Sequence, residues 1–219
     1  MDFFVKAKHW QLFLLLCGVP IVLQIFMLVS ISIAVTSGRP LLAIGNVFVL
    51  MPIATILFAI TLFSWLYNLG THFYGKLPKG IIISLNMFKV CIILPAAYIA
   101  ILSMLMFGLF KSMGALVTSG NADPTAISTQ ESILLSSMTF IFIMHLVSMA
   151  AIIYSLRFVA KTLRSIEIGQ EALINDYLGE FFLFWFFPIG IWVLQPRINK
   201  LFENISNHSD IVDTNQTHS

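Results

Sequence analysis

His145 is the residue best placed to do chemistry, because it stands in the middle of an apolar stretch that runs from Phe142 to Ser148. An ionisable group inside a membrane helix is costly and is typical of a proton relay or an ion ligand, and histidine titrates near neutral pH. A metal site needs three or four ligands, and only Cys91 offers a second one at a similar depth, so no metal is predicted. The alternative is a neutral imidazole that bridges helices by a hydrogen bond to Gln24 or to a carbonyl freed by a proline.

Carboxylates occur in two pairs four residues apart, Glu167 with Glu171 and Asp176 with Glu180. Paired carboxylates can bind a divalent cation or share a proton. A solvated or membrane-surface helix explains them without any function, and this reading is favoured for the first three. Glu180 differs because Phe181 and six further apolar residues follow it directly, which makes it a candidate polar site at the membrane boundary.

Three cations, Arg157, Lys161 and Arg164, precede these carboxylates and share one helical face at positions i, i+4 and i+7. A helix that leaves the membrane there, or lies on it, would turn this face toward anionic head groups. The lipid bilayer is therefore an expected partner. Nucleic acid is not, because the net charge is only +2 and no basic run occurs.

The elements that must position these residues are membrane helices. Of 219 residues, 58% are apolar and 10% are charged, whereas a soluble domain has about 25% charged residues. About 20 apolar residues are needed to cross a bilayer as a helix. Four segments meet this need, and the first is too long for a cleaved signal peptide. The sequence thus predicts an all-α polytopic transmembrane helix bundle over residues 1–203 and a polar, disordered tail over 204–219; the four spans are about 10–36, 46–68, 90–110 and 133–156.

A fifth segment, about 177–195, is either a short, proline-kinked span or a re-entrant segment. We expect it to cross, with a kink at Pro188, with Gly190 admitting a neighbouring helix, and with Trp192 and Arg197 at the outer end. The Lys and Arg distribution places the N-terminus in the cytoplasm in either case. With five spans the inner and outer loops hold eight and four Lys and Arg residues, and with re-entry they hold ten and two. The charge distribution alone thus favours re-entry.

Pro20, Pro95 and Pro188 are expected at a similar depth in three helices that run outward. A proline frees a carbonyl, which in lipid must find another partner. The pattern suggests a duplicated unit of inward helix, cytoplasmic link and outward helix, which supports a fifth span. The alternative is that proline is simply common in membrane helices. In the same scheme, residues 112–132 form an external loop.

The segment from Tyr154 to Arg157, the charged link after it, and the stretch from Phe187 to Arg197 carry a resemblance to a known group. They resemble small bacterial multi-pass membrane proteins with a domain of unknown function, whose last apolar segment reads roughly W-F-x-P-I-x-x-x-W-x-P. The similarity covers about the last 65 residues, and the interval from Trp192 to Pro196 is longer here. The resemblance implies a bacterial inner-membrane protein and implies no activity.

Two classes of function follow. The first is a non-enzymatic subunit, a scaffold or an oligomeric pore-type component, assembled with copies of itself or with other membrane subunits. The second is a small ion or lipid carrier, or a membrane enzyme, that uses His145 and the acidic cytoplasmic link. The sequence has no HExxH, GxSxG, P-loop or dinucleotide-binding glycine pattern, and no cofactor is expected. This favours the first class.

Overall fold

The computed structural model describes residues 3–38, 40–119 and 124–217, and within these ranges all regular structure is helical. The elements are α1 (Phe3–Lys6), α2 (His9–Phe13), the π-helix η1 (Leu14–Gly18), α3 (Val19–Thr36), α4 (Pro40–Tyr74), α5 (Leu85–Ser119), α6 (Pro124–Ile168), α7 (Ile174–Trp185) and α8 (Phe187–Thr217). The all-α class is confirmed.

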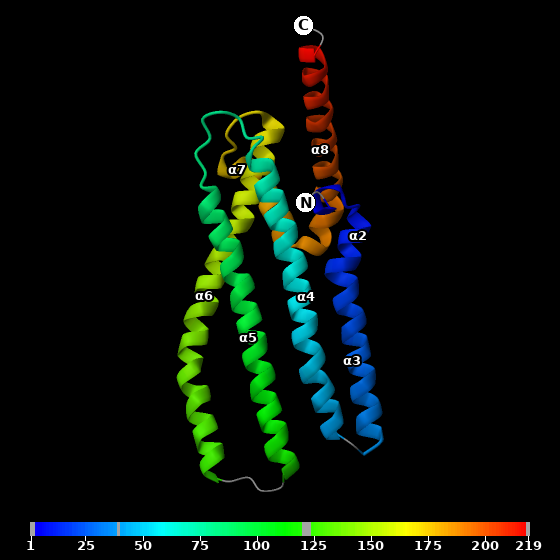
Figure 1. The fold of residues 1–219 in the computed structure, drawn as a ribbon, viewed down its shortest axis with the longest axis vertical. Helices are drawn as coiled ribbons and strands as arrows, with labels where there is room; N and C mark the ends of the chain where they lie inside the picture. Colours follow the sequence, from blue (N-terminus) through cyan, green and yellow to red (C-terminus); the bar gives the residue numbers. More distant parts are fainter. Residues whose placement is uncertain (1–2, 39, 120–123, 218–219) are drawn as a thin grey trace.

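Four helical stretches in the described ranges are long and apolar enough to cross a membrane: His9–Thr36, Leu50–Tyr74, Leu85–Gly108 and Met138–Ile168. They correspond to the four predicted spans. The helices that contain these four stretches lie side by side in the order α3, α4, α5, α6 (Figure 1). Neighbours in this row are also neighbours in sequence, so short turns suffice to connect them.

The N-terminus, the link 75–84 and the link 169–173 lie at one end of the molecule (Figure 1). The last turns of α3 and α5 and the first turns of α4 and α6 lie at the other end (Figure 1). The first three segments are those for which the sequence predicts a shared side of the membrane. We call the end that holds them the packed end, and the half of the row that holds the last turns of α3 and α5 the open half.

Two predicted boundaries differ in the structure. Helices α5 and α6 extend well into the segment 112–132, and the connection between them is 120–123, which lies outside the described residues. Pro124 is tolerated at the first position of α6, where its missing N–H would have no partner within the helix. Helix α8 continues to Thr217 and includes most of 204–219; a disordered tail there stays a prediction.

The fifth apolar segment is a hairpin of α7 and α8, broken at Phe186, whose φ of −92° and ψ of 54° are not helical. Pro188 prevents α7 from continuing, because its ring would clash with a carbonyl one turn earlier. In the first turn of α8 the same proline is tolerated. The carbonyl oxygen of Phe186 accepts hydrogen bonds from the backbone N–H groups of Ile189 and Gly190 at 3.1 and 2.9 Å, and these bonds start the new helix.

The expectation that this segment crosses the membrane is wrong. Glu180 and Arg197 are 17 residues apart, which would separate them by about 25 Å in a straight helix. Instead an Nη2–Oε1 distance of 2.8 Å joins them, so the chain reverses between them (Figure 1). Trp192 lies at the packed end as well, with its ring centroid 4.8 Å from that of His9. The segment is therefore a hairpin with both ends at the packed end, which is the arrangement that a re-entrant segment would have.

Gly190 has a close neighbour, as the sequence suggested, but that neighbour is the other arm of the hairpin. A Cβ at this position would overlap the carbonyl oxygen of Leu183 in α7. The three prolines have different settings: Pro20 follows η1 in the first turn of α3, Pro95 is inside α5, and Pro188 opens α8. Since α8 returns to the packed end while α3 and α5 leave it, the three helices do not share a direction (Figure 1).

The hydrophobic core is concentrated at the packed end. There the rings of Phe88 and Phe158 stack with their centroids 4.2 Å apart. The ring centroid of Trp65 lies 5.6 Å from that of Phe184 in the hairpin. The large side chains that are fully buried come from the beginning of the chain, the end of α4, the start of α5, the end of α6 and the hairpin. By contrast, only 11% of the most apolar window of the first span is buried within the chain.

Candidate functional site

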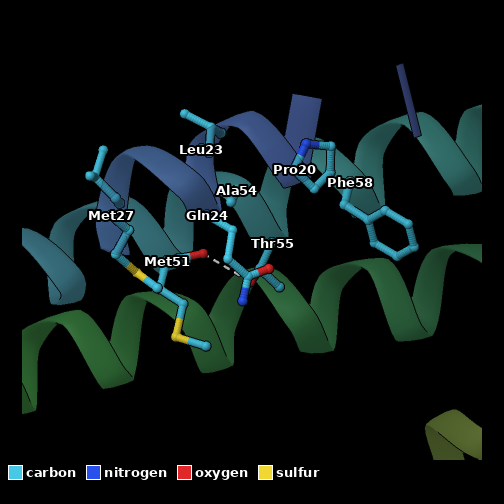
Figure 2. A pocket seen from close by; sticks show the side chains of 9 residues that line it. Pro20, Leu23, Gln24, Met27, Met51, Ala54, Thr55 and Phe58 are labelled. Atoms are coloured by element: carbon cyan, nitrogen blue, oxygen red, sulfur yellow. Dashed lines mark hydrogen bonds between the residues drawn. The ribbon is translucent and has the colours of Figure 1, made fainter. Parts of the chain in front are cut away.

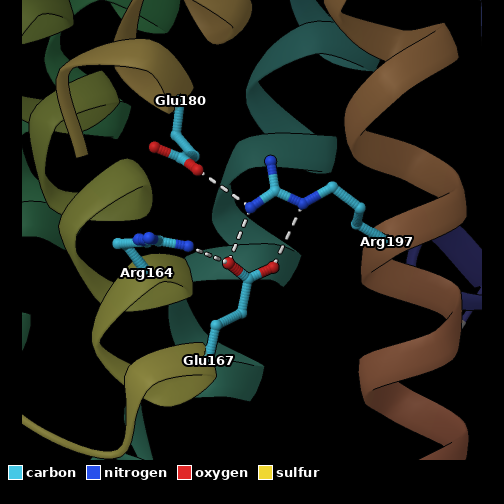
Figure 3. A network of polar contacts seen from close by, with 4 residues as sticks. All are labelled: Arg164, Glu167, Glu180 and Arg197. Atoms are coloured by element: carbon cyan, nitrogen blue, oxygen red, sulfur yellow. Dashed lines mark hydrogen bonds and ion pairs between the residues drawn. The ribbon is translucent and has the colours of Figure 1, made fainter. Parts of the chain in front are cut away.

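A cluster of four charged side chains, which we call the clamp, lies at the packed end where α6, α7 and α8 meet (Figure 3). The last turns of α6 supply Arg164 and Glu167, three residues apart on one helix face. Glu180 comes from α7 and Arg197 from α8. The hairpin therefore contributes one carboxylate and one guanidinium to a site whose other half is on a membrane-spanning helix.

Arg197 is the centre of the clamp. Its Nη2 is 2.6 Å from Oε2 of Glu167, its Nε donates to Oε1 of the same carboxylate at 3.2 Å, and its Nη2 also donates to Glu180. The side chain of Glu180 is only 9% exposed, against 33% for Arg197. A two-point contact between guanidinium and carboxylate fixes orientation as well as distance. The clamp therefore fixes the angle of α8 against α6.

The charges in the clamp balance, with two guanidinium groups facing two carboxylates. Nη1 of Arg164 is 3.3 Å from Oε2 of Glu167, and its buried Nε has no partner among the described residues. Burial alone would lower the pKa of Arg197, but hydrogen bonds and charges from Glu167 and Glu180 outweigh it and hold this pKa above its ordinary value. Arg197 therefore stays charged at every physiological pH.

Gln195, two residues before the clamp residue Arg197 of α8, is fully buried and was not singled out in the sequence. Its Oε1 accepts a hydrogen bond from Nε1 of Trp65 at 3.2 Å. Its Nε2 lies within 3.0 Å of the carbonyl oxygens of Phe4 and Ala7 and of Oδ1 of Asn199. One amide thus ties α8 to α4 and to the first residues of the chain. The signal available in sequence was a lone glutamine in an apolar run.

The three cations expected to face lipid head groups all have side-chain partners inside the molecule. Nε of Arg157 donates to the hydroxyl of Tyr177 at 3.0 Å, and Nζ of Lys161 is 2.6 Å from Oε1 of Glu171. Arg164 belongs to the clamp. Contact of these cations with head groups stays a prediction.

The carboxylates pair differently from the sequence spacing. Glu167 and Glu180 come from different predicted pairs and are joined through Arg197. The other member of each predicted pair has a different partner. Glu171 binds Lys161, and Asp176 accepts a hydrogen bond from the backbone N–H of Leu173 at the start of α7. Each of the four carboxylates therefore has a donor. Among the described residues, no three His, Cys, Asp or Glu side chains are grouped as a metal site requires.

His145 does not join the clamp. It lies on the exposed side of α6, where its ring faces that of Tyr98 edge-on at 6.1 Å. The hydroxyl of Tyr98 donates to the carbonyl oxygen of Ile141, one turn before His145, at 3.4 Å. The histidine therefore rests against an aromatic ring at the edge of the row.

Gln24 lies on α3, at the opposite edge of the row from α6, so the bridge from His145 to Gln24 does not form (Figure 1). The amide of Gln24 instead lines a pocket of about 200 Å³ between α3 and α4, next to Thr55 (Figure 2). The three polar candidates His145, Gln24 and Glu180 are thus in three separate places. The residues that the structure does bring together are those of the clamp and Gln195.

No protein-family model matches the chain, and neither a curated protein nor a solved structure is similar to it.

Proposed function

We propose that this protein is a non-enzymatic subunit or scaffold of the bacterial inner membrane, with its N-terminus in the cytoplasm. The clamp is the observation that carries the proposal. Its carboxylates and guanidinium groups bind each other across three helices, so the polar chemistry at the packed end serves to hold the hairpin in place.

The row of helices supports the same proposal from the membrane side. Large apolar side chains remain exposed along it, among them Ile101, Met104, Phe140 and Phe142, each more than 60% exposed. A row one helix thick has two broad apolar faces, which suit lipid and the apolar surfaces of other membrane proteins. A scaffold needs such lateral surfaces together with a rigid core, and the packed end supplies the core.

The charge distribution supports the orientation. With the re-entrant hairpin, ten of the twelve Lys and Arg residues belong to segments at the packed end. Short cytoplasmic loops of membrane proteins carry such an excess. The packed end is accordingly assigned to the cytoplasmic side.

A photo-reactive amino acid at Met104 or Phe140, introduced one at a time in the native host, tests lateral association. The proposal expects a discrete cross-linked product of one mass from at least one of these positions. A reactive group at Phe88, which is fully buried, is the matched control and should give none. Products with lipid alone at both exposed positions would contradict the proposal.

Flux through purified protein in liposomes tests the competing class. We expect no ion or lipid movement above that of empty liposomes, and the same result for His145→Gln. Flux by the wild type that His145→Gln abolishes would replace the scaffold with a carrier.

A further inference from the structure

The pocket between α3 and α4 contains the amide of Gln24, for which the described residues supply no hydrogen-bonding partner. Pro20 and Phe58 close the pocket on one side and Met51 on another, while Gln24 and Thr55 are its polar residues. The hydroxyl of Thr55 already donates to the carbonyl oxygen of Met51 at 2.9 Å. Gln24, in contrast, has no hydrogen-bonding partner in the part of the chain that the structure describes.

The position of Gln24 makes this unusual. It stands about 15 residues after His9 and about 12 before Thr36, the ends of the first span, so it lies about 18 Å or more from either end at 1.5 Å per residue. The hydrocarbon core of a bilayer is about 30 Å thick, so a residue at that position in a spanning helix lies near its middle, away from the head groups. A primary amide there has two N–H donors and a carbonyl acceptor that hydrocarbon cannot satisfy.

We infer that a second copy of this chain supplies the partner, in a dimer in which the two Gln24 side chains hydrogen-bond to each other. A primary amide carries its own complementary charges, since its N–H is positive and its oxygen negative. Two copies related by a two-fold axis along the membrane normal keep the same orientation in the bilayer. That symmetry puts both Gln24 side chains at one depth without any adjustment.

The surroundings of Gln24 fit such an interface. The side chain of Met51 is 55% exposed beside it, and the pocket of about 200 Å³ gives an apolar side chain of the second copy a place to enter. The first span is also the one whose most apolar window is least buried by its own chain. Interhelical hydrogen bonds between amides stabilise association of membrane helices, so the Gln24 pair would contribute to affinity as well as register.

This inference rests on the proposed lateral association and names a partner for it. Energy transfer between donor-labelled and acceptor-labelled copies in liposomes, measured over a series of protein-to-lipid ratios, tests it. Wild type should show transfer that rises and saturates with protein density. Gln24→Leu should shift the midpoint to about tenfold higher density. Gln24→Asn keeps an amide and should recover part of the shift.

Ser32→Ala is the matched control. Ser32 is a polar residue of the same helix, but its hydroxyl already donates to the carbonyl oxygen of Leu28 at 2.9 Å. It should associate as wild type does. Because Gln24 is exposed in the monomer, Gln24→Leu should fold normally, and an unchanged thermal unfolding curve checks this.

Two results would overturn the inference. One is a wild-type protein that shows no transfer above random proximity at any density. The other is Gln24→Leu with the association of wild type. Either result, combined with discrete cross-links to other proteins from Met104 or Phe140, would leave the scaffold proposal standing. If neither the energy-transfer experiment nor the cross-linking experiment detects association, the dimer inference and the scaffold proposal are both wrong.

Discussion

The packed end and the open half of this molecule are built from the same long helices and differ in what lies between them. At the packed end the hairpin enters between α4, α6 and the N-terminal segment and brings Phe184, Gln195 and Arg197 with it. In the open half nothing of the described chain is added to the row, and residues such as Val22 and Met104 remain 65% and 71% exposed. The difference shows that the hairpin in the C-terminal fifth of the chain supplies the contacts that bury the core, and that the membrane spans alone do not.

Polar groups illustrate the same contrast. Gln195 at the packed end is fully buried and has partners on α4 and in the N-terminal segment, whereas Gln24 in the open half has none in the described chain. A buried amide that is satisfied rigidifies its surroundings, and one left unsatisfied in lipid needs another molecule. The packed end is therefore a structural unit, and the open half is where we place association.

The contrast between the packed end and the open half depends on the hairpin. The largest expected effect is in a labelling test of the hairpin's topology. In a background lacking Cys17 and Cys91, a cysteine at Ser209 of α8 should react with a membrane-impermeant maleimide only after lysis. Cysteines at Gly80 and Gln170, in the two links of the packed end, should behave alike. Labelling of Ser209→Cys on intact cells, with the other two still protected, would show that the segment crosses after all.

The turn of the hairpin should be the most sensitive packing site. Gly190→Ala places a methyl group against the backbone of Leu183, which cannot move aside as a flexible side chain would, so we expect a loss of about 3 kcal/mol of stability. Gly179→Ala in α7 is the control, since nothing surrounds a Cβ there, and better helix propensity should stabilise it by up to about 1 kcal/mol. Denaturation of the detergent-solubilised protein measures both. Equal stability of the two variants would mean that the arms of the hairpin are not closely packed.

The clamp should contribute less to the stability of the protein than the close packing at the turn of the hairpin does. Arg197→Met leaves Glu167 and Glu180 without their shared donor, and breaking a buried ion pair costs about 3–5 kcal/mol. Since the clamp is partly exposed, we expect about 2 kcal/mol in the same denaturation assay. Lys200→Met, at an exposed site one turn further along α8, should change stability by less than about 0.5 kcal/mol.

Adding Glu167→Gln and Glu180→Gln to Arg197→Met removes the uncompensated negative charges and should restore part of the loss. If Arg197→Met is as stable as Lys200→Met, the four side chains do not form a clamp.

His145 in the open half should have the smallest effect on stability. His145→Leu replaces an exposed imidazole that faces the ring of Tyr98 with a side chain that lipid solvates well. We expect a change of less than about 1 kcal/mol, since an aromatic contact is worth about that at most. A thermal unfolding series in lipid nanodiscs checks this. A loss of about 2 kcal/mol or more of stability would contradict this, and it would show that a polar side chain stabilises the open half as Gln195 and the clamp stabilise the packed end.

Four helices long and apolar enough to span a membrane, their approximate limits, and the placement of the N-terminus and the two long links at one end followed from the sequence alone. They follow because about 20 apolar residues in a row have one stable solution in a bilayer, and because loop cations stay on the cytoplasmic side. Pro188 and Gly190 were recognisable as a backbone feature for a similar reason, since proline restricts its own chain locally. The distribution of Lys and Arg favours re-entry, whereas the loose proline repeat favours a fifth span.

Tertiary structure alone decided which polar residues meet. Glu180 binds Arg197 only because the chain reverses at Phe186. A straight helix would separate the two residues by about 25 Å. The hairpin packs against Trp65 of α4 and Glu167 of α6, so the reversal depends on how those helices are placed. Spacing along one helix predicted partners for Glu167 and Glu180 within their own segments, since it can compare only residues within a few turns. Apart from Asn199 on its own helix, the partners of Gln195 are on α4 and at the N-terminus, more than 120 residues away in sequence. Contacts at such separation are set by how the helices pack, and no local pattern records them.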